Sequence, residues 1–301
     1  MEHEIVSHIE RKGPLRGAEL QVAVAGDPIV LWKTCLLSEK LMVRRVGIRY
    51  LRLDRTIEGF ARLSPSILRE FMTYSVIGCA GDRNGIERRA REITDAIDRI
   101  STAKLNLVRS LVTDIMRRPE CAAMLDYDYC FIVAGDIVYS MAHDVPRPER
   151  STGRMVKGSD IDMIVIAEDR VPDALLKKLD DVIYKEKYRL LVMPSINEEI
   201  DYIVKKMQRV RKQLSFSTFK HMVACKIIQE GLLLAGSEKM FTQIKNLLYE
   251  TGVSEKLYAM HLSAEAFRMQ AEEYLLGETP DRMDKKNLYL FYTSEESEEF
   301  E

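Results

Sequence analysis

The chain has 301 residues, of which 46% are hydrophobic and 31% are charged, and its formal net charge is −2. This composition is typical of folded globular proteins, and the length suits two or three domains. The near-neutral charge excludes a general attraction to nucleic acid, so any such binding would need a local basic patch.

Two features of the sequence bear on the cellular compartment. No apolar run approaches the roughly 20 residues that span a bilayer, and the first residues, MEHEIVSHIERKG, are charged and amphipathic, unlike a signal peptide. We therefore expect no membrane segment and a cytoplasmic protein. The five cysteines are spread along the chain without a Cys-x-x-Cys pair, which argues against a disulfide framework and a structural zinc site.

The first 55 residues favour three short helices followed by a β-hairpin. Helical patterns cover residues 4–13, 14–24 and 27–40. In the stretch KLMVRRVGIRYLRLDR, residues 40–55, Gly47 separates two runs rich in Val, Ile, Leu and Tyr, which indicates a hairpin. This order resembles a winged helix-turn-helix domain, to which we assign residues 1–56.

The same region carries the candidate basic patch, with six basic residues and one acid between Lys40 and Arg55. A winged helix could place its third helix in a DNA or RNA groove and its basic wing on phosphates. Equally, the domain could serve protein contacts, with its arginines on a solvated strand face. The candidate nucleic-acid contacts are Lys33, Arg44, Arg45 and Arg49.

Helical patterns dominate two further segments. Residues 57–118 read as a helical connector, with one long helix or a broken pair over 84–116. Residues 213–301 read as a C-terminal helical region, interrupted by the strand-like GLLLAGS and ending in the acidic tail SEESEEFE. We expect that tail to be disordered, because like charges with few apolar residues cannot offset the entropy of ordering.

Residues 119–212 alternate between strand and helix patterns. Strands are predicted at 129–135 and 161–168, a helix at 172–188, and two short strands at RLLVM and EEIDYIVKK. Between the first two strands lies a long irregular segment. The predicted fold class is α+β or α/β, with a mixed sheet flanked by helices at the centre of the chain.

Within this sheet, the stretch KGSDIDMIVI places Asp160 and Asp162 one residue apart at the start of an apolar strand. Successive side chains of a strand point to opposite faces, so the two carboxylates share a face. Their repulsion is relieved only by solvent, a proton or a bound cation. The pair is therefore either a solvent-facing strand entrance or half of a cation site.

These residues resemble the DNA polymerase β-like nucleotidyltransferase superfamily. Its pattern is a strand ending in glycine, then a strand opening with Asp-x-Asp, then a strand with a third carboxylate, here Gly135, Asp160 with Asp162, and Asp201. The stretch FKHMVACKIIQEGLLLAGS is similar to a motif that follows in small members. The resemblance implies magnesium, or manganese, held by the three aspartates as the catalytic set, with a nucleoside triphosphate, expected to be ATP, as substrate.

The phosphate end of the pattern departs from the family. A serine or glycine usually follows the first glycine, whereas here Gly135 is followed by Asp136, a poor phosphate ligand. The candidate nucleotide-binding residues are Gly135, Asp136, Ser140 and Ser159. The arginines of the irregular segment, Arg147, Arg150 and Arg154, could clamp phosphates or belong to a solvated loop.

Two functions follow as hypotheses. The first is a magnesium-dependent enzyme that moves a nucleoside monophosphate from a triphosphate to a hydroxyl on protein, RNA or a small molecule, with release of pyrophosphate. The alternative is a nucleic-acid-binding transcriptional regulator whose nucleotidyltransferase-like domain senses a nucleotide. The sequence does not indicate the acceptor or the oligomeric state.

Overall fold

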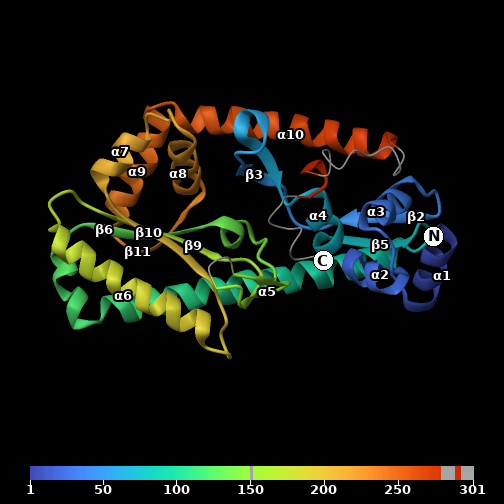
Figure 1. Ribbon diagram of the computed structural model, residues 1–301, viewed down its shortest axis with the longest axis horizontal. Coiled ribbons are helices and arrows are strands. Elements are labelled where there is room, and N and C mark those ends of the chain that lie inside the picture. The colour runs from blue at the N-terminus through green and yellow to red at the C-terminus, as the bar shows by residue number, and fades with distance from the viewer. Residues whose placement is uncertain (150–151, 279–288, 293–301) are drawn as a thin grey trace. The chain divides into compact units, whose positions relative to one another are not determined.

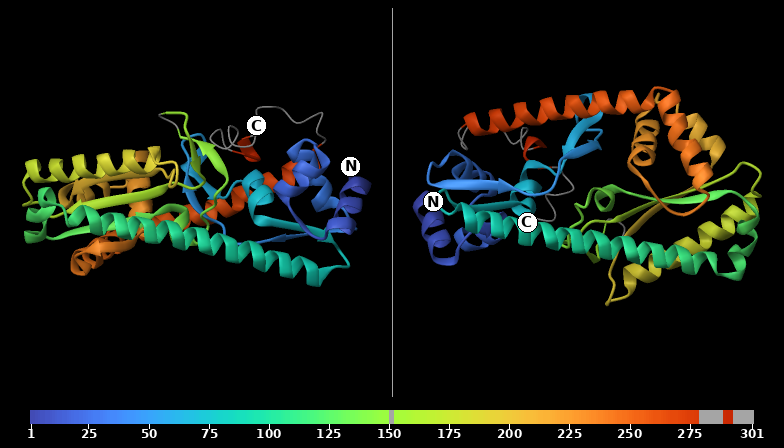
Figure 2. Two further views of the ribbon diagram at one scale, coloured as in Figure 1. Left: turned by 90° about the horizontal axis from the view of Figure 1, so that it is seen from below. Right: turned by 180° about the vertical axis from the view of Figure 1, so that it is seen from behind.

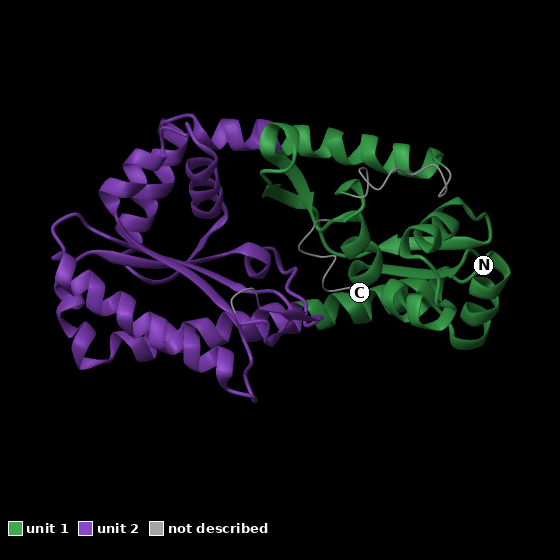
Figure 3. Cartoon of the chain, viewed as in Figure 1, with its two compact units in different colours: residues 1–97, 261–301 green, residues 98–260 purple. Residues whose placement is uncertain are grey.

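A computed structural model describes residues 1–149, 152–278 and 289–292 (Figure 1). The predicted acidic tail lies outside these residues. The chain is of mixed α+β class and divides into two compact units, residues 1–97 with 261–301 and residues 98–260 (Figure 3). Each unit has its own sheets. This division into two units is coarser than the four segments expected from the sequence. Its boundary after residue 97 lies within a long helix, Arg83–Met116.

The first unit opens with the three predicted helices. They are α1 (Glu2–Lys12), α2 (Gly17–Val24) and α3 (Pro28–Leu37). The third helix has a clear start signal, because the Asp27 carboxylate accepts the backbone amides of Ile29 and Val30 and Pro28 occupies the first turn. The helices pack around a core that includes Leu20, Leu31 and Trp32.

The hairpin predicted at residues 40–55 is wrong. The strands exist, but they belong to different sheets: β2 pairs with β5 in a sheet of order β1-β5-β2, and β3 pairs with β4 (Figure 2). The strands of the first unit are β1 (Leu15–Arg16), β2 (Leu41–Arg45), β3 (Tyr50–Leu53), β4 (Ala61–Ser64) and β5 (Ser75–Cys79). The short helical turn η1 (Glu58–Phe60) and α4 (Ile67–Tyr74) complete the segment.

The expected helical connector is therefore only partly helical. Its first part contains β4, α4 and β5, and short apolar runs such as SVIGC cannot be told from buried helix by periodicity alone. Its second part forms one continuous helix of 34 residues, α5 (Arg83–Met116), as the apolar spacing indicates.

The second unit is built on a four-stranded sheet of order β10-β9-β6-β11. Strand β9 runs parallel to β10 and antiparallel to β6, which is also antiparallel to β11. The sheet is mixed, as predicted. Its strands are β6 (Tyr129–Ala134), β9 (Ile161–Ala167), β10 (Ile200–Lys206) and β11 (Leu232–Gly236).

Helices cover both faces of this sheet (Figure 1). On one face lie α5 and α6 (Asp173–Val192), with η2 (Pro119–Asp126) against α6; on the other lie α7 (Met207–Gln213), α8 (Phe219–Glu230) and α9 (Glu238–Glu250). The last helix, α10 (Val253–Gly277), follows α9 and continues into the first unit. The stretch RLLVM, predicted as a strand, is instead the last turn of α6 together with its C-cap, Met193. Its Leu190 and Leu191 are buried at helical spacing with Val182 and Ile183, so the pattern continues the helix.

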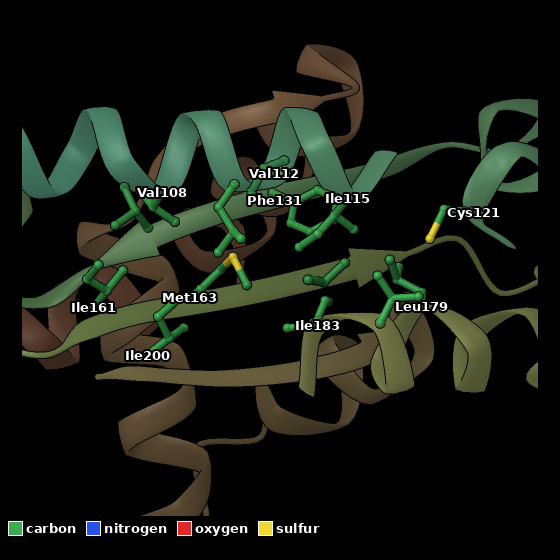
Figure 4. Packing of buried hydrophobic residues seen from close by; sticks show 14 of the residues in the cluster. Val108, Val112, Ile115, Cys121, Phe131, Ile161, Met163, Leu179, Ile183 and Ile200 are labelled. Carbon is green, nitrogen blue, oxygen red and sulfur yellow. The ribbon is translucent and has the colours of Figure 1, made fainter. Parts of the chain in front are cut away.

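Alternate residues of β9 and β10 face the layer formed by α5 and α6. Ile161, Met163 and Ile200 are buried there against Val112 and Leu179 (Figure 4). Residues of the opposite parity, which include Asp160, Asp162 and Asp201, therefore belong to the other face of the sheet.

The irregular segment between β6 and β9 contains three small elements. A helical turn, η3 (Gly135–Tyr139), follows β6 directly, and β7 (Pro146–Pro148) and β8 (Met155–Lys157) then pair in an antiparallel ribbon.

In the described part of the chain, no single helix is long and apolar enough to cross a membrane. Only α2 and α3 taken together, a pair bent by 112°, have the length and composition of such a segment.

Candidate functional site

The three predicted aspartates lie at one edge of the sheet of the second unit. Asp162 and Asp201 are register partners on the parallel strands β9 and β10, and Asp160 lies two residues before Asp162. Because β6 runs antiparallel to β9, its carboxyl end, where Ala134 pairs with Asp162, reaches the same edge. The fold therefore gathers residues that lie far apart in the sequence.

Gly135 lies directly against Asp162. Its φ is +73°, and a Cβ added there would come within 2.4 Å of the Asp162 Oδ2 atom. Glycine is the residue that adopts this conformation at little cost and allows such an approach. The sequence pattern that paired Gly135 with the Asp-x-Asp motif thus corresponds to a close contact.

Asp136 is bonded within the chain. The hydroxyl of Ser159 donates to Asp136 Oδ2 at 2.6 Å, and the backbone amide of His143 donates to the same hydroxyl at 3.2 Å. Ser159 is buried, with 4% of its surface exposed. Both residues, predicted as nucleotide contacts, therefore tie the turn after β6 to the loop before β9. Ser140 ends that turn in the left-handed region (φ 52°) and is exposed.

Arg147, on β7, also bonds within the unit. Its Nε donates to the carbonyl of Gly158 at 2.8 Å, and its guanidinium lies 2.8 Å from the carboxylate of Glu199 and 3.8 Å from that of Asp160. Of the other two arginines considered as phosphate clamps, Arg154 is exposed and Arg150 lies outside the described residues.

Glu199 is a fourth carboxylate at this edge that the sequence interpretation missed. Its pKa is raised, chiefly by burial and further by the charges of Asp160 and Asp201, although the Arg147 guanidinium opposes the rise. The sequence did contain a sign of this carboxylate, because Glu198 and Glu199 directly precede β10. The edge is thus a negatively charged group of side chains with cations beside it.

The carboxylates at this edge are of the right chemical kind to bind a divalent cation, but their side chains do not converge on one point. Carboxylate oxygens are the ligands that magnesium prefers. Among the described residues, however, no three His, Cys, Asp or Glu side chains converge closely enough to hold a metal ion. Asp201 Oδ1 instead lies 2.9 Å from Lys187 Nζ on α6.

The predicted nucleic-acid contacts are mostly paired or buried within the first unit. Lys33 is 8% exposed and donates to the backbone carbonyl of Glu278, so it does not lie on an open helix face. Arg49 binds Glu70 and Glu272, and Arg45 binds the same two carboxylates.

Arg44 is half-exposed and lies 2.9 Å from Glu87. The basic patch seen in the sequence is thus largely offset by acids from α4, α5 and α10.

The chain matches no model of a protein family, no curated protein and no solved structure.

Proposed function

We propose that the second unit is a nucleotidyltransferase that moves a nucleoside monophosphate from a triphosphate, ATP being the first candidate, to a hydroxyl acceptor. One observation carries the proposal: Asp162 is the register partner of Asp201 and lies in contact with Gly135. Gly135, Asp162 and Asp201, which the superfamily pattern lists in chain order, therefore lie at one edge of the sheet.

Each residue has a role in this proposal. Asp160, Asp162 and Asp201 would hold magnesium, which would supply charge stabilisation at the phosphates of the triphosphate. Asp201, on the edge strand, would orient the acceptor hydroxyl and take its proton. Arg147 and Lys187 balance the carboxylates until the cation and the substrate bind.

The test is transfer of label from each of the four nucleoside triphosphates, with magnesium, to the protein, to RNA or to small molecules in a cell extract. Asp162→Asn and Asp201→Asn should lower the rate by more than about 100-fold, because even outer-shell partners of metal ligands cost 10–100-fold. Asp181→Asn is the matched control, since Asp181 is as exposed as Asp201 (55%) and also pairs with a lysine. Full activity in a folded Asp162→Asn chain would refute the proposal.

A second candidate, a nucleic-acid-binding regulator, is supported by the topology of the first unit. The support is the order of its elements: three helices lie among the strands of a sheet of order β1-β5-β2, in which β5 pairs with β2 in place of the expected second hairpin strand. The pairing of Arg45 and Arg49 weakens the phosphate role assigned to them. Salt-dependent DNA and RNA binding by the full chain, with Arg44→Ala compared, tests this candidate; absence of binding at low salt would remove it.

A further inference from the structure

The turn that brings Gly135 against Asp162 is held by a buried carboxylate from a distant part of the chain. Glu230, the last residue of α8, accepts the backbone amide of Gly135 at 3.2 Å and the hydroxyl of Tyr139 at 2.7 Å. Its side chain is 5% exposed and also pairs with Lys226. Three different donors therefore meet on one carboxylate, which offsets the cost of burying its charge.

The position of Glu230 is itself fixed by the end of α8. Lys245, on α9, donates to the backbone carbonyls of Ile228, Gln229 and Gly231 at 2.8, 2.7 and 2.9 Å. The last carbonyls of a helix have no partner within the helix, so one ammonium group satisfies this terminus.

Gly231 brings the same terminus onto the sheet. A Cβ added to Gly231 would lie 2.4 Å from the Cγ2 atom of Ile132 on β6. The backbone therefore approaches β6 as closely as glycine permits, and Glu230 reaches the end of that strand. A helix end, a carboxylate and the turn after β6 form one connected unit.

On its other side, the turn determines the surroundings of Asp162. Gly135 is in the left-handed region, and an added Cβ would lie 2.4 Å from Asp162 Oδ2, so a rotation of the turn would change the distance between the Gly135 backbone and this carboxylate. Burial, together with the adjacent carboxylate, raises the pKa of the Tyr139 hydroxyl. The hydroxyl therefore keeps its hydrogen and donates a hydrogen bond to Glu230.

We infer that Glu230 is a positioning residue: it holds the turn from Gly135 to Tyr139 against Asp162, and Lys245 holds Glu230 in place through the end of α8. The inference rests on the proposed function for its effect on the reaction. Its effect on the turn does not depend on that function and can be measured alone.

The first test is hydrogen exchange of the full chain without nucleotide, comparing Glu230→Ala, Glu230→Gln and wild type. Glu230→Ala should speed exchange of the amides from Gly135 to Met141 by more than tenfold and leave the central amides of β9 unchanged. Glu230→Gln, which keeps an acceptor oxygen, should give a smaller change. Lys245→Met should also speed hydrogen exchange of the amides from Gly135 to Met141. Unchanged exchange in Glu230→Ala would overturn the inference.

The second test separates positioning from general destabilisation. Glu186, on α6, is a similarly buried carboxylate of the same unit (8% of its side chain exposed) that pairs with Arg118 and Arg189. At concentrations of urea where both variants remain folded, Glu230→Ala should lower kcat of label transfer at least tenfold more than Glu186→Ala, with partial rescue by Glu230→Gln.

Equal losses in the two alanine variants would show that Glu230 has only a structural role and would overturn the inference. Absence of transfer by the wild-type chain, by contrast, would refute the proposed function. The exchange data would then decide by themselves whether Glu230 holds the turn.

Discussion

Ser159, which is buried, donates its hydroxyl hydrogen to Asp136 across 2.6 Å and so links the turn after β6 to the loop before β9. Hydrogen bonds to charged groups contribute more than neutral ones, so Ser159→Ala should lower the free energy of unfolding by about 1.5–3 kcal/mol. Urea unfolding measures this. Ser140→Ala, which removes an exposed hydroxyl from the same turn, should stay within about 0.5 kcal/mol of wild type. Equal effects would contradict the role of the link.

Gly135 and Gly153 offer a matched pair for the close approach to Asp162. Both have positive φ, +73° and +66°, but a Cβ would be 2.4 Å from the Asp162 carboxylate at Gly135 and would meet nothing within 4 Å at Gly153. Gly153→Ala should cost about 1–2 kcal/mol for backbone strain alone. Gly135→Ala should cost clearly more in the same unfolding assay; similar costs would mean that the turn yields to the methyl group.

Arg49 and Arg44 should differ sharply in stability although both belong to the sequence's basic patch. Arg49 binds Glu70 at 2.5 Å and Glu272 at 2.6 Å, and only 9% of the Glu70 side chain is exposed. Arg49→Ala should destabilise the chain by about 1.5–3 kcal/mol, because Glu70 loses a charged hydrogen-bond partner although Arg45 and Arg268 remain beside it. Arg44→Ala breaks a half-exposed pair with Glu87 and should cost less than about 1 kcal/mol. Thermal and urea unfolding of the two variants check the contrast.

Lys205 should give the protein a measurable pH dependence in alkaline solution. Burial, and to a lesser extent the charge of Arg209, lowers the pKa of this lysine from its usual 10.5 to about 8. Between these values the unfolded chain binds more protons than the folded one, so the contribution of Lys205 to stability rises with pH.

Lys205→Met removes this group, so the stability of wild type relative to the variant should increase by up to about 3 kcal/mol from pH 8 to 10.5. The comparison cancels other titrating groups. Urea unfolding at four or five pH values measures it. A constant difference would show that the amine, which donates to Gln213 Oε1 at 2.8 Å, keeps an ordinary pKa in the fold.

The sequence predicts best where a pattern is local. Period-two alternation locates β9 and places Asp160 and Asp162 on one face, and the apolar spacing of residues 84–116 predicts α5. It fails where partners are distant. Nothing near Val43 indicates that its strand partner is Ile77, because β3, β4 and α4 intervene.

The site shows the same limit. Glu230 lies 95 residues from Gly135, and no local signal links a helix-terminal glutamate to a backbone amide on another element. Likewise, Arg49 reads as an open cation until α4 and α10 supply Glu70 and Glu272. Counting charges within one segment of the chain could not reveal this compensation.

The parallel pairing of β10 with β9 has a consequence for errors in assembly. A shift of β10 by one residue would bring Ile200 or Tyr202 beside Asp162 and turn Asp201 into the layer of α5 and α6. Such a slip would bury a carboxylate and expose apolar side chains at once. The apolar residues of β10 that fill the core therefore also fix the position of Asp201 beside Asp162. No shift of β10 by one residue can separate this pair without also destabilising the core.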